Sequence, residues 1–211
     1  FSSPDEVLER EIMNHLFPDT TYGCESGGDP KNIPDLAYEN FLNFHRTYYH
    51  PSNSYIYLYG NMDMEEKLAF LDEHYLSHFD YLDVDSVIQE QKAFGACRDV
   101  TLEYPVAENE GEEDNTYLSY NMVVGNAADS QMAMAFEVLD YALLSAPGAP
   151  LKQALLDVKA GKDVYGSYDD GILQPSFTVI AKGSNPDRKE EFVSVIRQVL
   201  GDIVKNGIED R

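Results

Sequence analysis

The chain has 211 residues, of which 43% are hydrophobic and 12% aromatic, so it is long enough to bury a core as one large domain or two small ones. Its formal net charge of −23 argues against nucleic-acid binding, because binding phosphates requires clustered Lys and Arg. The charge is compatible with attraction of cationic peptides, and equally with simple solubility. No apolar run approaches the roughly 20 residues that a membrane-spanning helix needs.

The first predicted element is a helix that runs from Ser3 to about Leu16. Ser3–Pro4–Asp5–Glu6 has the form of a capping box with proline at the first helical position, and Phe17–Pro18–Asp19 ends the pattern. Its apolar side is formed by Val7, Leu8, Ile12 and Leu16.

A glycine-rich loop and an aromatic helix come next. In the loop, residues 26–30 (SGGDP), the glycines can adopt positive φ angles and the residue before proline is kept out of the α region. The helix is predicted over residues 36–49, with Asp35 accepting hydrogen bonds from its first free N–H groups. Its broad apolar face contains Leu36, Phe41, Leu42, Phe44 and Tyr48.

A turn at residues 50–53 separates this helix from a predicted strand. Pro51 cannot continue a helix. Over residues 55–59 (YIYLY) tyrosines alternate with aliphatic residues, which is the two-residue period of a strand, and Gly60 closes it.

The middle of the chain predicts one more helix, a linker and a pair of strands. Asp63 and Glu66 form a second capping box. Periodicity weakens over residues 81–96, which indicates a linker. Strands at 100–104 and 116–124 could pair as a hairpin across the acidic loop 108–114, which is interpreted as a solvated connection and not as a metal site. The inward residues of the helix that follows Asp63 are Leu68, Leu71, Tyr75 and Leu76.

The last part of the chain mixes helices and strands without regular alternation. Asp129 caps a helix that is broken at residues 147–150, and a second helix covers 151–158. Strands are predicted at 163–168 and 177–181. The irregular order favours an α+β fold over a doubly wound parallel sheet. The inward residues are Met132, Phe136, Leu139 and Leu143 in the first of these helices, and Phe192, Ile196, Val199, Leu200 and Ile203 in a long helix that starts after Asn185–Pro186.

Several of these segments carry a family resemblance that covers most of the chain. The runs SGGDP, IP-x-L-x-YE-x-F-x-x-FH-x-x-YYHPSN and YLYGN resemble the pitrilysin and insulinase family of metallopeptidases, and most closely its presequence-protease-like branch. The segments APGAPLKQALL and KDVYGSYDDGILQPSFTVIAK are also similar to that family. Ala37 departs from the family's threonine, which affects only the expected helix cap.

The resemblance implies an α+β fold made of antiparallel sheets with helices packed on one face, in two partial LuxS/mitochondrial-processing-peptidase-like metallohydrolase domains. Residues 1–80 would be the C-terminal part of a first, catalytic-type domain, 81–97 a linker, and 98–211 the N-terminal part of a second, non-catalytic domain. Because the chain starts at Phe1 without methionine and stops just after a helix, we expect an internal fragment of a longer protein; a natural domain trimmed of its tag is the alternative.

The resemblance also implies zinc chemistry, but the sequence provides no residue for it. The family's inverted motif H-x-x-E-H supplies two zinc ligands and a glutamate that activates water. None of the five histidines is followed by x-x-Glu-His. The third, carboxylate ligand would lie just before Phe1, and the assisting arginine and tyrosine beyond Arg211. We therefore assign no catalytic and no metal-binding residue here, and expect zinc in the full-length enzyme but none in this fragment.

Two histidine pairs and one loop are the other candidate sites. His74 and His78 have the i, i+4 spacing of a shared metal site, but Tyr75 replaces the glutamate of H-E-x-x-H, so a surface pair is favoured; His45 and His50 straddle a helix end and are interpreted as structural. No nucleophile or phosphate-binding motif is present. A glycine-rich loop lets a peptide approach the backbone closely, so the predicted substrate-binding residues are Ser26, Gly27 and Gly28, with a plain turn as the alternative.

The functional prediction is therefore a fragment of a zinc-dependent metalloendopeptidase that degrades unstructured peptides in a closed chamber. The alternatives are a non-catalytic peptide-binding or scaffold module of the same fold, and a free-standing acidic interaction domain. The expected partners are peptide substrates and the missing N- and C-terminal domains, with no nucleic acid and no membrane, and the fragment is expected to self-associate through exposed apolar surface. Cys24 and Cys97 are too few for a disulfide scaffold, which fits a cytoplasmic location.

Overall fold

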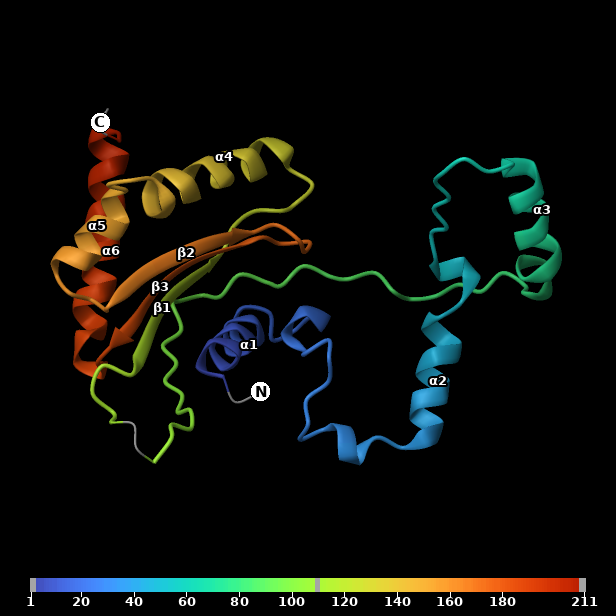
Figure 1. Ribbon diagram of the computed structural model, residues 1–211, viewed down its shortest axis with the longest axis horizontal. Helices are drawn as coiled ribbons and strands as arrows, with labels where there is room; N and C mark the ends of the chain where they lie inside the picture. Colours follow the sequence, from blue (N-terminus) through green and yellow to red (C-terminus); the bar gives the residue numbers. More distant parts are fainter. Residues whose placement is uncertain (1–2, 109–110, 209–211) are drawn as a thin grey trace. The chain divides into compact units, whose positions relative to one another are not determined.

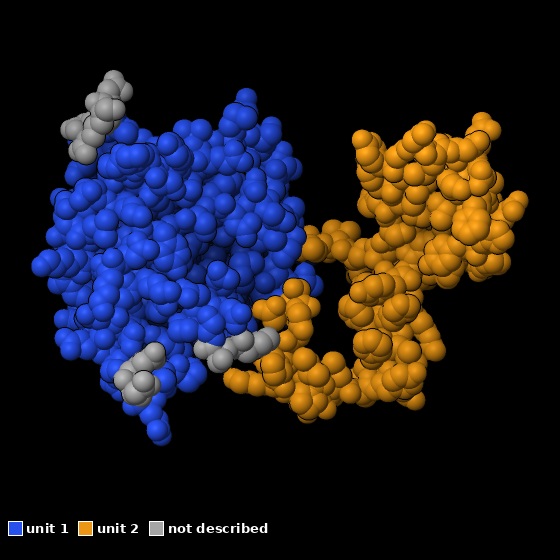
Figure 2. Space-filling view, in the orientation of Figure 1, with its two compact units in different colours: residues 1–24, 89–211 blue, residues 25–88 orange. Residues whose placement is uncertain are grey.

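The computed structural model describes residues 3–108 and 111–208 and divides the chain into two compact units. Unit 1 consists of residues 1–24 and 89–211, and unit 2 of residues 25–88 (Figure 2). This division groups the first helix with the second half of the chain. The predicted domains at 1–80 and 98–211 concern the intact protein, and they stay a prediction.

Unit 1 is built on a three-stranded antiparallel sheet in the order β1-β3-β2 (Figure 1). The strands are β1 (Thr116–Val123), β2 (Asp163–Asp169) and β3 (Ser176–Ser184), and all three lie where the sequence predicted strands. In the register Asn121 lies opposite Thr178, which in turn lies opposite Ser167. The predicted α+β fold is confirmed.

The predicted hairpin between residues 100–104 and β1 is wrong. Residues 100–104 form no strand, and β1 pairs with β3. The segment reaches β1 through side chains: the Tyr104 hydroxyl donates a hydrogen bond to the Asn115 carbonyl, and its ring stands edge-on to Tyr117. Pro105 has no N–H to extend a ladder at this edge.

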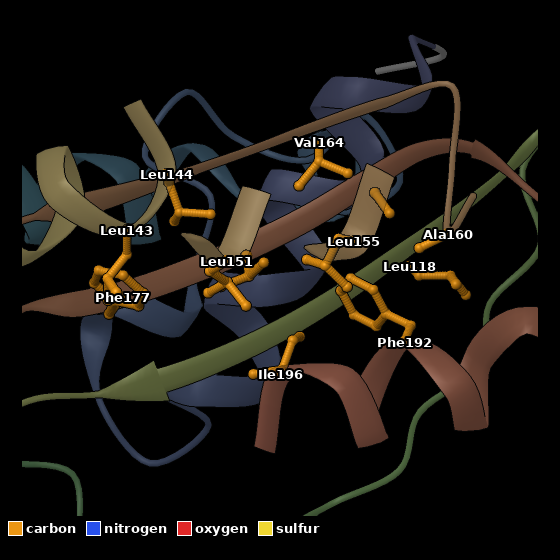
Figure 3. Close-up of a cluster of buried hydrophobic side chains, with 12 residues drawn as sticks. Leu118, Leu143, Leu144, Leu151, Leu155, Ala160, Val164, Phe177, Phe192 and Ile196 are labelled. Carbon is orange, nitrogen blue, oxygen red and sulfur yellow. The ribbon is translucent and has the colours of Figure 1, made fainter. Parts of the chain in front are cut away.

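The helices α4 (Ser130–Asp140), α5 (Pro150–Asp157) and α6 (Lys189–Asn206), together with a π-helical turn at Tyr141–Ser145, cover one face of the sheet. The alternating residues of β3 that face them belong to one buried apolar cluster. Figure 3 shows this core between the sheet and the helices. Its members are Leu118, Leu143, Leu144, Leu151, Leu155, Ala160, Val164, Phe177, Val179, Ala181, Phe192 and Ile196.

Most predicted features of these helices are confirmed. The Asp129 carboxylate accepts a hydrogen bond from Met132 N at 3.0 Å and caps α4. Phe192 and Ile196 of α6 are fully buried, and a 3₁₀ turn at Pro186–Arg188 precedes that helix. The inward placement of Met132 is wrong, because it lies in the first turn of α4 and is 42% exposed.

Helix α1 (Pro4–Leu16) contacts the opposite face of the sheet. The helix forms where predicted, with proline in its first turn, but Ser3 makes no side-chain capping bond, so the capping box is absent. After α1 the chain buries Phe17 completely and forms a 3₁₀ turn at Thr21–Gly23.

Unit 2 contains two helices and three 3₁₀ turns, and none of its residues is buried. Helix α2 (Tyr38–Tyr48) starts later than predicted, because residues Ile33–Asp35 form a 3₁₀ turn and Ala37, which has no capping side chain, precedes the helix. Helix α3 (Met64–His74) is capped by Asp63 as predicted. The other two turns are Pro51–Asn53 and Leu76–His78.

The predicted strand at residues 55–59 is wrong. The segment forms no ladder, and the side chains of Tyr55, Tyr57 and Tyr59 are at least 85% exposed. Residues 25–88 contain no strand, so residues 55–59 have no strand in unit 2 with which to form a ladder. The predicted inward faces of α2 and α3 are only partly covered. Leu42, Leu71 and Leu76 are half-buried, whereas Leu36, Phe41, Phe44, Leu68 and Tyr75 are exposed.

Candidate functional site

The predicted substrate loop folds as an ordinary exposed turn. Gly28 has a φ of +85°, and its N–H donates to the Glu25 carbonyl at 3.2 Å. The Gly27 N–H donates to the Glu25 carboxylate at 3.2 Å, and Ser26 is exposed. The positive φ explains a glycine at position 28. Substrate contact by Ser26, Gly27 and Gly28 stays a prediction.

The histidines of unit 2 make structural contacts. His45 stacks on Tyr49 at a centroid distance of 4.8 Å, and His74 packs on Phe70 at 4.5 Å. The Nδ1 atom of His50 accepts a hydrogen bond from Ser52 N at 3.2 Å. Each of these three rings therefore has a local packing or capping role.

The part of the chain that the structure describes does not fit a zinc ion. Residues 3–108 and 111–208 contain no group of three or more His, Cys, Asp or Glu placed to hold a metal. His74 ends α3 and His78 ends the following 3₁₀ turn, and no third ligand from the described residues joins them. We derive no chemical step through a metal from these residues.

The polar face of the sheet is where segments distant in sequence meet. Lys182 of β3 donates to both carboxylate oxygens of Asp5 in α1, at 2.9 and 3.0 Å. Its ammonium group also lies 5.1 Å from the centroid of the Tyr117 ring. Hydrogen bonding to Tyr117 and then to Asp5 raises the pKa of Lys182. The ion pair of Lys182 with Asp5 joins α1 to the sheet. Burial, followed by the nearby Asp5 charge, raises the pKa of Tyr165 on the same face.

Gln91 is the centre of a second set of long-range contacts in unit 1. It is 6% exposed and is hydrogen-bonded to two other segments of unit 1. Its side chain accepts from Asp19 N at 2.9 Å and donates to the Asp19 carboxylate at 2.7 Å, while its own N–H donates to Gln174 Oε1 at 2.6 Å. The loop after α1 is also tied to this region, because the Tyr22 hydroxyl accepts from Leu173 N at 3.2 Å.

The acidic loop ends in an ordered contact at Asp114. Its carboxylate accepts from Asn185 Nδ2 at 2.8 Å and lies 3.2 Å from Lys162 Nζ. The Asn185 hydrogen bond, followed by Lys162, lowers the pKa of Asp114. Asn109 and Glu110 of the predicted loop lie outside the described residues. Asp114 thus connects the segment before β1 with the segment before α6 through its hydrogen bond to Asn185, which is a structural role.

A depression at the start of α6 has no buried polar group directed into it among the described residues. Its charged residues are of both signs, and Lys189 and Asp99 form an ion pair across it. Three buried side-chain atoms elsewhere in the described chain have no hydrogen-bond partner: the Asn121 amide oxygen, the Tyr168 hydroxyl and one Asp140 carboxylate oxygen. Burial raises the pKa of Tyr168 and of Asp140.

These long-range contacts have no local signal in the sequence. Asp5 and Lys182 are 177 positions apart, and Gln91 and Gln174 are 83 apart. Each is an ordinary polar residue in its own segment.

Fold and polar contacts together define an antiparallel α+β domain in which hydrogen bonds and ion pairs join segments distant in sequence. Among these residues no helix has the length and apolar character needed to cross a bilayer.

The chain belongs to the peptidase M16 family, because the sequence profile of the "Peptidase M16 inactive domain" matches residues 35–211. It is 46% identical over 209 residues to Protein HypA of Clostridium perfringens, covering 99% of this chain and 22% of that protein. It is 34% identical to Presequence protease 1 of Arabidopsis thaliana and 30% identical to the mitochondrial presequence protease of Xenopus laevis, covering 100% and 99% of this chain and 20% and 21% of those proteins.

These matches confirm the resemblance to the pitrilysin and insulinase metallopeptidases and to the presequence-protease branch. The chain spans about a fifth of the length of these curated relatives. An M16-like peptidase from Alicyclobacillus acidocaldarius has the same fold, with a TM-score of 0.60 at 17% identity over 99% of this chain and 48% of that one.

Proposed function

We propose that this chain forms part of the chamber of a longer, zinc-dependent metalloendopeptidase that degrades unstructured peptides, and that it supplies no zinc ligand itself. The observation that carries the proposal is the match of residues 35–211 to an inactive M16 domain in a chain whose relatives are named presequence proteases. The role of unit 1 is then to present a rigid sheet, which its apolar core and the contacts of Lys182 and Gln91 stabilise.

The charge of the chain points to a class of peptide. With 38 acidic and 15 basic residues, the chain creates a negative potential that favours cationic peptides at low ionic strength. The glycine loop at residues 26–28 is proposed as one contact, because its exposed backbone permits close approach.

A second candidate is a non-catalytic peptide-binding or scaffold module. The description of the matched domain as inactive favours it. The two candidates differ in whether a longer protein that contains this chain hydrolyses peptides.

The test compares the 211-residue chain with the longer protein on two fluorogenic peptides of equal length, one basic and one acidic. Zinc content is measured after dialysis by mass spectrometry. We expect the chain alone to retain no stoichiometric zinc and to cleave neither peptide. The longer protein should cleave the basic peptide faster, lose the activity to a chelator and regain it with zinc.

Each other result has a defined meaning for the proposal. Stoichiometric zinc and cleavage by the chain alone would overturn the assignment of the metal to other parts of the protein. Peptide binding without cleavage by the longer protein would replace the peptidase with the scaffold module. Equal cleavage of both peptides would refute the selection by charge.

A further inference from the structure

The chain leaves unit 1 after Cys24 and returns to it at Gln89, so residues 25–88 are joined to unit 1 by two connections (Figure 2). Tyr22 lies on the first connection, two residues before Cys24, and Gln91 lies on the second, two residues after Gln89. Both residues make hydrogen bonds within unit 1. These bonds lie close to the points at which the chain enters and leaves unit 1.

Both connections are bonded to the same turn, residues 170–175 between β2 and β3. The Leu173 N–H of this turn donates to the Tyr22 hydroxyl at 3.2 Å. The next residue, Gln174, is bonded to Gln91 in both directions. Its Oε1 accepts from Gln91 N at 2.6 Å, and its Nε2 donates to the Gln91 carbonyl at 3.3 Å. Two adjacent residues of one turn therefore hold the two connections.

The two connections are also bonded to each other. Gln91 Oε1 accepts from Asp19 N at 2.9 Å, and its Nε2 donates to the Asp19 carboxylate at 2.7 Å and to the Lys92 carbonyl at 3.3 Å. Every polar group of Gln91 thus has a partner, while the residue is only 6% exposed. A replacement that leaves some of these buried partners unpaired is costly.

An apolar contact supports the first connection. Phe17 is fully buried, and the Tyr22 ring stands edge-on to it at a centroid distance of 6.0 Å. Gly23 lies against the Phe17 main chain, since a Cβ atom there would be 2.3 Å from the Phe17 carbonyl oxygen. The Tyr22 hydroxyl is therefore carried by a ring with a fixed position, and it offers its acceptor to Leu173 from there.

We propose that these hydrogen bonds form a clamp, which holds both connections as one cooperative unit and opens as a whole. The residues of the clamp are Asp19, Tyr22, Gln91, Leu173 and Gln174. Its opening would free residues 18–24 and 89–93 together, as a local unfolding that leaves the apolar core packed. The clamp then determines whether unit 2 is joined to unit 1 by two fixed connections or by two loose ones. This inference does not depend on the peptidase function.

The first test measures amide hydrogen exchange by NMR. The N–H groups of Asp19, Gln91 and Leu173 are donors inside the clamp, so each reports on one of its bonds. Tyr22→Phe removes only the hydroxyl that accepts from Leu173. Cooperative opening predicts that it also speeds exchange at Asp19 and Gln91 by about fivefold, although neither is bonded to Tyr22. Exchange in β3 should stay unchanged.

The second test changes the centre of the clamp. Gln91→Glu keeps the shape of the side chain, removes its donor to Asp19 and brings two carboxylates together, so it should speed exchange at Leu173 by about tenfold. The matched control is Gln153→Glu in α5, where an exposed amide donates to Asp157 at the same 2.7 Å and exchange at Leu173 should not change. Adding Asp19→Asn to Gln91→Glu supplies a donor from the other side and should slow exchange at Leu173 by about threefold.

Faster exchange only at the amide whose own partner is removed would show independent contacts and overturn the clamp. An equal rise in β3 would show that all of unit 1 is loosened, which also overturns it. The same holds if Gln153→Glu acts like Gln91→Glu, or if Asp19→Asn gives no recovery. Should Gln91→Glu fail to fold, Tyr22→Phe decides, because it removes a single hydroxyl.

Discussion

Gly166 of β2 leaves no room for a side chain. A Cβ atom there would lie 2.3 Å from the Thr178 carbonyl oxygen and 2.4 Å from Leu144 Cδ1. Because both neighbours belong to the packed sheet and core, neither can move away freely. We expect Gly166→Ala to destabilise unit 1 by about 1–3 kcal/mol, measured by denaturant unfolding.

Gly201 is the matched control for this prediction. It lies inside α6, and a methyl group added to its Cα would meet no atom within 4 Å among its described surroundings. Gly201→Ala should therefore stabilise the protein by about 0.5–1 kcal/mol through the higher helix propensity of alanine. If both variants change stability in the same direction, the close packing around Gly166 is not the cause.

The contacts of Asp114 predict a pH dependence. Its pKa is lowered from 3.8 in the folded state, chiefly by the Asn185 hydrogen bond and then by Lys162. The contribution to stability is therefore present above pH 3.8 and is lost as pH falls through the lower, folded-state pKa. Asparagine can adopt the positive φ of 57° at position 114, so Asp114→Asn removes the charge without straining the backbone. This variant should be less stable than wild type at pH 7.

The measurement is the free energy of unfolding of both proteins between pH 7 and pH 2. The difference between them should shrink as pH falls below 3.8 and through the lower pKa at which Asp114 becomes protonated in the folded state. A difference that is constant over this range would mean that the charge of Asp114 does not contribute.

Residue-scale prediction from the sequence succeeds where the chemistry is local. Asp63 and Asp129 are predicted as caps, and each accepts a hydrogen bond from an N–H three residues later. Ser3 and Asp35 have the same type of sequence signal, but neither makes a capping bond. The Lys182–Asp5 contact could not be predicted, because it depends on how α1 meets the sheet.

At the scale of elements, the helices could be predicted from their apolar periodicity, because that pattern depends only on the residues of the helix itself. The strands β1, β2 and β3 are also predicted, but the partner of β1 is not. Choosing between residues 100–104 and β3 requires the tertiary arrangement, in which β3 lies between the two other strands.

The two segments predicted as strands and found outside the sheet illustrate the limit of the two-residue period. Residues 55–59 alternate more regularly than β2 does, yet they form no ladder. Alternation shows that a segment can present two different faces, whereas a strand also requires a neighbour that accepts its hydrogen bonds. The sequence cannot show whether that neighbour is present.

At the scale of the whole molecule, the family and the α+β class could be predicted because many matching residues occur in the same order. The same distinction between local and distant contacts applies to the candidate site. The turn at residues 26–28 depends on neighbouring residues and could be predicted. The contacts of Lys182 and Gln91 join segments far apart in sequence and could not.

The last prediction follows from the unequal burial of the two units. All buried residues of the described chain lie in unit 1, and none lies in residues 25–88. Because most helix stability in proteins comes from tertiary packing, α2 and α3 should open at little free-energy cost. Hydrogen–deuterium exchange at low protein concentration should therefore show amides of α2 and α3 exchanging at least a hundredfold faster than those of β3 and α6. Comparable protection of α2 and β3 would contradict this interpretation of unit 2.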